Sequence, residues 1–103
     1  MTVLIYHIAE PDLWDAEAET YAAESLTSEG FIHCSTETQL RGVAEAFYEG
    51  RTDVIVLTID VARLEKPPVF EDLYDHGAGF PHIYGPIPTS AVTSTRSIDE
   101  ALG

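Results

Sequence analysis

Apolar and polar positions along the chain predict several short strands and few helices. Residues 2–8 are apolar and rich in β-branched side chains, which predicts an opening strand with His7 near its end. The continuous apolar run over residues 54–59 predicts a strand that is buried on both faces. Shorter apolar segments predict further strands over residues 31–34, 69–71 and 91–96.

The strongest helical pattern follows Thr36. Thr36 and Gln39 have the spacing of a capping box, and Gly50 is the residue type expected just after a helix. Between them, apolar residues recur at helical spacing. The predicted buried stripe consists of Leu40, Val43, Ala44 and Phe47.

The remaining segments predict less regular structure. A short acidic helix is expected to begin at Pro11 and run to residue 18. Residues 25–30 and 75–79 have turn or loop composition, and three prolines exclude a helix over residues 80–88. Residues 97–102 are expected to form a frayed tail. The sum predicts one α+β domain over residues 1–103, with one good helix and one short helix.

Charge and cysteine content exclude several classes of partner. Eighteen acidic and five basic residues give a net charge of −13, which repels duplex nucleic acid and anionic membranes. Any anionic ligand must therefore be held locally, by backbone amides or by the few arginines. With one cysteine the chain has no internal disulfide, which is typical of a reducing cytoplasm, and we expect no signal peptide.

Three histidines are the most informative polar residues. His7, His33 and His82 lie in separate apolar segments, where a buried imidazole needs a hydrogen-bonding partner. His33 and His82 each follow a phenylalanine by two residues, so the same pair of residue types occurs on one side of both segments. We predict that the three imidazoles converge on one concavity with Tyr84 and Glu71 at its wall. The alternative is three separately satisfied histidines.

A metal site and a reactive thiol are less well supported. His33 and Cys34 are adjacent in a predicted strand, so their side chains point to opposite faces and cannot easily share one zinc ion. We therefore expect no metal. Cys34 is expected to be a buried structural cysteine, and Ser35 and Thr36 suit helix capping.

Several sequence motifs resemble those of one family, the small bacterial proteins grouped as domain of unknown function 952. The two longest motifs are Glu-Gly-Phe-Ile-His-Cys-Ser over residues 29–35 and Phe-Pro-His-Ile-Tyr-Gly-Pro over residues 80–86. The resemblance implies a fold like the core of ADP-ribosyltransferases, with a bent, split, mostly antiparallel sheet and a cleft between its halves.

The resemblance also implies NAD or a related nucleotide as ligand and cofactor. Enzymes with this fold hold a ribose with a first-strand histidine, stack an aromatic residue on nicotinamide and stabilise a developing cation with a late glutamate. His7 matches the histidine, Tyr48 or Tyr84 the aromatic residue, and Glu71 the acid. The predicted catalytic residues are His7, His33, His82 and Glu71. The predicted cofactor-binding residues are His7, Ser35, Tyr48 and Tyr84.

These residues support three hypotheses of function. The first is a cytoplasmic protein that binds NAD or a related nucleotide and carries out glycosyl transfer or hydrolysis, as a monomer or weak homodimer. The second is a domain that binds a small ligand or a partner protein without turnover. The third is a metal-independent hydrolase or isomerase that uses histidines as general acid and base. A carboxylate across a cleft from His7 favours the first, and a histidine–carboxylate hydrogen bond without a nucleotide pocket favours the third.

Overall fold

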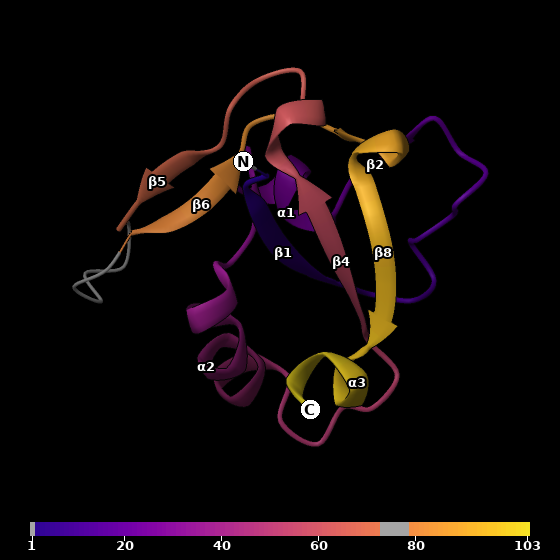
Figure 1. The fold of residues 1–103 in the computed structure, drawn as a ribbon, viewed down its shortest axis with the longest axis vertical. Coiled ribbons are helices and arrows are strands. Elements are labelled where there is room, and N and C mark those ends of the chain that lie inside the picture. The colour runs from indigo at the N-terminus through magenta and orange to yellow at the C-terminus, as the bar shows by residue number, and fades with distance from the viewer. Residues whose placement is uncertain (1, 73–78) are drawn as a thin grey trace.

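The structure is a computed structural model that describes residues 2–72 and 79–103, so the loop predicted over 75–79 lies outside it except for Gly79. It is an α+β fold of antiparallel sheets and short helices (Figure 1). The first sheet has the strand order β1–β4–β8, with bounds Leu4–Ala9, Ile55–Asp60 and Val92–Ser97. The second sheet has the order β3–β6–β5, with bounds Ile32–His33, Phe80–Ile83 and Val69–Glu71.

The remaining elements are short, apart from α2. A two-stranded sheet pairs β2 (Thr20–Tyr21) with β7 (Ile87–Pro88). The helices are α1 (Glu24–Ser28), α2 (Glu37–Phe47) and α3 (Ile98–Leu102), with 3₁₀ turns η1 (Val61–Arg63) and η2 (Thr89–Ala91). In the described ranges, every helix is too short or too polar to cross a membrane.

In the described residues, one isolated backbone bridge joins the two three-stranded sheets. Tyr6 of β1 exchanges two backbone hydrogen bonds of 2.8 and 2.7 Å with Ser35, which follows β3. Beyond this bridge β1 pairs with β4, while β3 pairs with β6. The hairpin of β5 and β6 therefore projects away from the first sheet (Figure 1). The prediction of an α+β fold with mostly antiparallel strands is confirmed.

Strands β1 and β4 of the first sheet are buried on both faces, whereas the middle of the edge strand β8 is exposed. Neighbouring residues of a strand point to opposite sides, so each of the two buried strands contributes to two cores. On one face Ile5 and Leu57 pack with Ile32 and Ile83 of the second sheet. On the other face Tyr6, Ile8, Val54 and Val56 pack beneath α2 and α3, which lie side by side in Figure 1. The prediction of a doubly buried strand over residues 54–59 is confirmed, since four of the six residues of β4 are buried and its two ends are half-buried.

The cap of α2 is confirmed, but its predicted buried stripe is wrong at one position. The backbone N–H of Thr36 donates to Gln39 Oε1 at 3.0 Å, as a capping box requires. Leu40 and Ala44 are buried, yet Phe47 is 73% exposed. The residue that packs against the core at the helix end is Tyr48. The helix therefore contacts the core through Leu40, Ala44 and Tyr48. These residues lie four apart, along the ridge that commonly packs in helix contacts.

Three other predictions of local structure are corrected. Residues 11–18 form turns and no helix, because Asp15 Oδ1 accepts from the backbone N–H of Glu17 and competes with helical hydrogen bonding. The short helix is instead α1, within the segment predicted as a turn. The tail is the helix α3, capped by Ser97, whose side chain accepts from the Glu100 backbone N–H at 3.2 Å. His7 lies within β1, which continues to Ala9.

Candidate functional site

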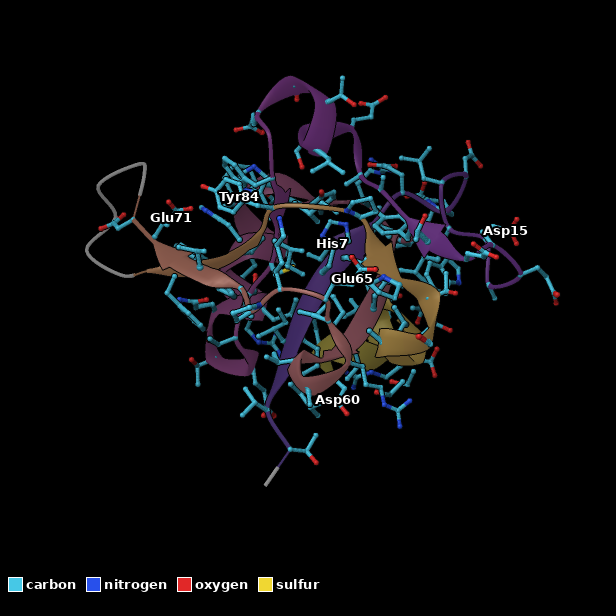
Figure 2. The ribbon with its side chains drawn as sticks, turned by 90° about the horizontal axis from the view of Figure 1, so that it is seen from above. His7, Asp15, Asp60, Glu65, Glu71 and Tyr84 are labelled. Atoms are coloured by element: carbon cyan, nitrogen blue, oxygen red, sulfur yellow. The ribbon has the colours of Figure 1, made fainter. Side chains whose placement is uncertain are left out.

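Four of the predicted site residues gather on one face of the β3–β6–β5 sheet. His33 and His82 are direct register partners of β3 and β6, so their side chains leave the sheet on the same side. Their ring centroids are 5.3 Å apart. Glu71 comes from the neighbouring strand β5, and Tyr84 follows the end of β6 (Figure 2). We call His33, His82, Glu71 and Tyr84 the histidine face.

Each histidine of this face is held by its own carboxylate. His33 Nε2 donates to Glu29 Oε2 at 2.9 Å, and His82 Nδ1 donates to Glu71 Oε1 at 3.0 Å. The Tyr84 hydroxyl donates to the same Glu71 Oε1 at 2.5 Å. Oε1 of Glu71 therefore receives two hydrogen bonds. Within the described residues Glu71 Oε2 receives none, which leaves it available to a ligand.

Phe31 forms the floor of the histidine face. Residues 31 and 33 lie on the same side of the chain, since side chains alternate along an extended segment. The Phe31 ring stacks on His82 with centroids 4.2 Å apart and lies 5.4 Å from Tyr84. Phe31 is 5% exposed, so it excludes water from beneath the imidazole. The packing fixes the His82 ring, which in turn orients Glu71.

The members of the histidine face differ in exposure. His82 is buried, whereas the side chain of His33 is 42% exposed and that of Glu71 is 25% exposed. Tyr84 is also exposed. A ligand would therefore meet His33, Glu71 and Tyr84, with His82 behind them. A cavity of about 170 Å³ lies next to this surface and is lined by Tyr84, Lys66 and others.

Hydrogen bonding sets the charge of the acid. The Tyr84 hydroxyl, and then His82, hold the pKa of the Glu71 carboxyl below its usual range, because both donate to the ionised form. The same bond to Glu71 raises the pKa of Tyr84, so its hydroxyl stays protonated. At neutral pH the face presents a fixed negative charge beside a hydroxyl donor.

His7 is close to His33 but does not share the exposed surface. Its Nδ1 donates to the backbone carbonyl of His33 at 2.6 Å. A carbonyl can only accept, so Nδ1 carries the proton and Nε2 accepts from the Tyr21 hydroxyl at 2.8 Å. His7 is 6% exposed, deeper in the fold than Glu71 and Tyr84 (Figure 2). His33 and His82 therefore lie side by side, and His7 contacts this pair from behind through the His33 carbonyl.

Burial keeps His7 neutral. Desolvation lowers its pKa to about 4, so His7 supplies no positive charge to a phosphate at pH 7. Acidification from pH 7 to pH 5 should therefore destabilise the fold by about 2 kcal/mol through His7, because the unfolded imidazole takes up a proton near pH 6.5 while the folded one resists. The contribution of neutral His7 to the free energy of unfolding is fully present above the pKa of the unfolded imidazole and is lost as pH falls toward 4.

Urea unfolding at pH 7 and pH 5 measures this effect by comparing the wild-type protein with His7→Gln. The variant should show a smaller loss on acidification. NMR titration of the His7 ring gives the same answer without a variant. A His7 pKa near 6.5 in the folded protein would contradict the expected loss.

The two other predicted cofactor-binding residues lie apart from the histidine face. Ser35 is 3% exposed, and its backbone forms the bridge to Tyr6 between the two sheets. Tyr48 packs against the core beneath α2. Ser35 is therefore too buried for its predicted role, and the half-buried Tyr48 lies in a different part of the fold.

Sequence reasoning missed Glu29 and Tyr21. Glu29 lies four residues before His33, and the turn between them passes through Gly30 at φ +91°, a conformation that favours glycine. The Glu-Gly-x-x-His spacing is the signal that would have found the pair. Tyr21 carries no such signal, because the partner of His7 is set by the tertiary fold.

Metal and thiol chemistry find little support in the described part of the chain. Residues 2–72 and 79–103 contain no group of three or more histidine, cysteine, aspartate or glutamate side chains able to hold a metal ion. Cys34 is buried, and burial raises the pKa of its thiol far above the usual range, which suppresses the nucleophilic thiolate.

Comparison with known proteins identifies the family. The family model described as "Protein of unknown function (DUF952)" matches residues 8–95, most of the chain.

The chain belongs to the DUF952 family.

The family predicted from the sequence motifs is thereby confirmed. This DUF952 protein is also similar to solved structures of protein CC0527 from Caulobacter crescentus. The crystal structure of CC0527 shares 28% identity with a TM-score of 0.80, covering 92% of this chain and 85% of that one. The solution NMR structure of CC0527 has a TM-score of 0.67, also at 28% identity, covering 90% and 82% of the two chains. No curated protein matches the chain.

Proposed function

We propose that the histidine face of this DUF952 protein binds the sugar of a nucleotide and promotes cleavage or transfer at its glycosidic bond. The observation that carries the proposal is the ionised Glu71 carboxylate, fixed through Oε1 by Tyr84 and His82. Glycosidic cleavage passes through an oxocarbenium-like, positively charged transition state. A preoriented carboxylate stabilises such a charge without reorganising during the reaction.

The lowered pKa of Glu71 favours this role over that of a general base. A general base works best when its pKa lies near the working pH, whereas Glu71 is held as a weak base. Electrostatic stabilisation needs the opposite property, a charge that persists. The unengaged Oε2 is the oxygen that would face the sugar.

Neighbouring groups supply the remaining parts of the proposed site. When the nicotinamide–ribose bond breaks, nicotinamide leaves as a neutral ring, and water or an acceptor hydroxyl forms the new bond to the sugar. The half-exposed His33, oriented by Glu29, takes the proton that this water or hydroxyl loses. The exposed Tyr84 ring offers a stacking surface for a base. Lys66 lines the adjoining cavity of about 170 Å³ and supplies a positive charge for a phosphate. His7 is a positioning residue, because it holds the backbone carbonyl of His33.

The proposal includes the finer fold assignment, an ADP-ribosyltransferase-like split sheet. It is supported by the isolated bridge between Tyr6 and Ser35, on either side of which the described strands divide into β1–β4–β8 and β3–β6–β5. One feature differs from the expected pattern: both ring nitrogens of the buried His7 are already engaged, one with a backbone carbonyl and one with the Tyr21 hydroxyl. The sugar contacts of this proposal therefore fall to His33 and Glu71.

A second candidate is a metal-independent hydrolase or isomerase. The specific observation in its favour is the pair of histidine–carboxylate hydrogen bonds, His33 with Glu29 and His82 with Glu71. In that case His33 is the general acid and base, and the substrate needs no nucleotide.

Calorimetry and turnover assays separate the candidates. The probes are NAD, ADP-ribose, p-nitrophenyl acetate and bis-p-nitrophenyl phosphate. We expect saturable binding of ADP-ribose and release of nicotinamide from NAD. Turnover of an ester probe without NAD binding would favour the second candidate. Absence of both binding and turnover with NAD and ADP-ribose would overturn the glycosidic proposal.

A further inference from the structure

A second cavity lies on the opposite side of the first sheet, away from the histidine face. It has a volume of about 240 Å³, and its walls include Tyr6 of β1, Arg96 of β8, Leu40 and Arg41 of α2, and Leu102 of α3. Tyr6 and His7 are neighbours in β1 and point to opposite faces. The cavity is therefore separate from the proposed glycosidic site.

Basic residues are few in this chain, and a large share of them line this cavity. The chain has only five lysine and arginine residues against eighteen acidic ones, and two of the five line this one space. Arg51 is paired with Glu10 and Asp53, so its charge is already used. Within the described residues, no ion pair joins Arg41 or Arg96 to a carboxylate, but Arg41 Nη2 donates to the backbone carbonyl of Leu102, and the exposed Glu37 lines the cavity as well.

The sheet face at this cavity also carries unpartnered polar atoms. Arg96 Nε and Thr58 Oγ1 are buried in the described part of the chain without a hydrogen-bonding partner. Thr58 is 6% exposed and is the register partner of Tyr6, while Arg96 is the register partner of Val56. Strand alternation places both side chains on the face beneath α2 and α3. Buried polar groups are normally satisfied, so an unpaired guanidinium N–H at a cavity points to an acceptor that binds there.

We propose that this cavity binds the carboxylate end of a small organic acid. The guanidinium of Arg96 offers parallel N–H donors in a planar fork, which matches a carboxylate in bidentate geometry. Leu40 and Ala101 add small apolar patches to a lining that is mainly polar, which suits a compact acid. The volume of the cavity corresponds to about eight water molecules, which suits a ligand well below nucleotide size. Charge, unpaired donor and size agree on this class of ligand.

NMR titration of the full chain with hexanoate tests the proposal. We expect saturable shifts of the Arg96 Nε–H signal and of amides in α2 and α3. Hexanol has the same tail without the charge and should give no saturable shift, and inorganic phosphate should bind more weakly than hexanoate. Equal binding of hexanol would overturn the proposal, and so would tighter binding of phosphate.

Matched variants locate the site. Arg96→Gln should weaken hexanoate binding by about tenfold or more, and Arg96→Lys should weaken it less, because lysine keeps the charge but loses the fork. Arg63→Gln is the control, since it removes the same charge from an arginine that instead lies beside Asp60 and Ser90. Unchanged binding in both Arg96 variants, or equal weakening in Arg63→Gln, would contradict the assignment. His33→Ala should leave hexanoate binding intact, which separates this proposal from the glycosidic one.

Discussion

Glu71→Gln is expected to reduce the release of nicotinamide from NAD by about 10²–10³-fold, the loss typical of removing one preorganised electrostatic contact. Glutamine has nearly the same shape, so the packing around Phe31 and Tyr84 should persist. It removes the negative charge that the proposed transition state requires. The binding of ADP-ribose should change much less than the rate, because the product carries no oxocarbenium charge.

The measurement is kcat for NAD with calorimetric binding of ADP-ribose beside it. Glu49→Gln is the matched control, since it removes the same charge from an exposed position beyond the end of α2. A Glu71→Gln protein with wild-type kcat would show that the Glu71 carboxylate does not stabilise the transition state. Equal losses in kcat and in thermal stability would instead indicate a structural role for the Glu71–His82–Tyr84 hydrogen bonds.

Leu57→Ala is expected to lower the free energy of unfolding by about 2–5 kcal/mol, a large part of the total for a domain of this size. Leu57 has no exposed surface and lies at the centre of β4, between β1 and β8. Its removal leaves a cavity among large apolar side chains from both three-stranded sheets. The surroundings cannot collapse easily, because strand pairing fixes the backbone on both sides.

Phe47→Ala supplies the contrasting measurement. Although the helical pattern predicts a core position, the ring is 73% exposed, so its loss should change stability by about 0.5 kcal/mol or less. Urea unfolding of the two variants gives both numbers. A loss of several kcal/mol in Phe47→Ala would restore the stripe predicted from the sequence and contradict the packing of Tyr48 at the helix end.

Local pattern predicted the elements whose residues carry their own signals. The apolar run of β4 is long enough to need burial on both faces. The capping pair Thr36 and Gln39 marks the start of α2 whatever surrounds it. The same type of signal, a serine three residues before a glutamate, is present at Ser97 and Glu100 at the start of α3, although the segment was predicted to be a frayed tail.

The site was predictable in part, for a related reason. Side-chain alternation alone places Phe31 with His33, and His82 with Tyr84, on common sides of their segments. What alternation cannot supply is the register between segments some fifty residues apart. That register sets His33 opposite His82 and brings Glu71 within 3.0 Å of His82. It arises from the packing of the whole sheet.

The sequence by itself determined the acidic charge, the absence of an internal disulfide, the main strands and the helix α2, because each follows from composition or from contacts a few residues apart. The family was identified from the resemblance of sequence motifs to those of its members. Only the tertiary structure decided that His7 is neutral and turned inward, that Glu71 is held ionised by Tyr84 and His82, and that Arg96 has an unpaired donor beneath α2. These properties depend on burial and on distances between strands that are remote in sequence. Desolvation and hydrogen bonding act through space, so no local pattern of residues encodes them.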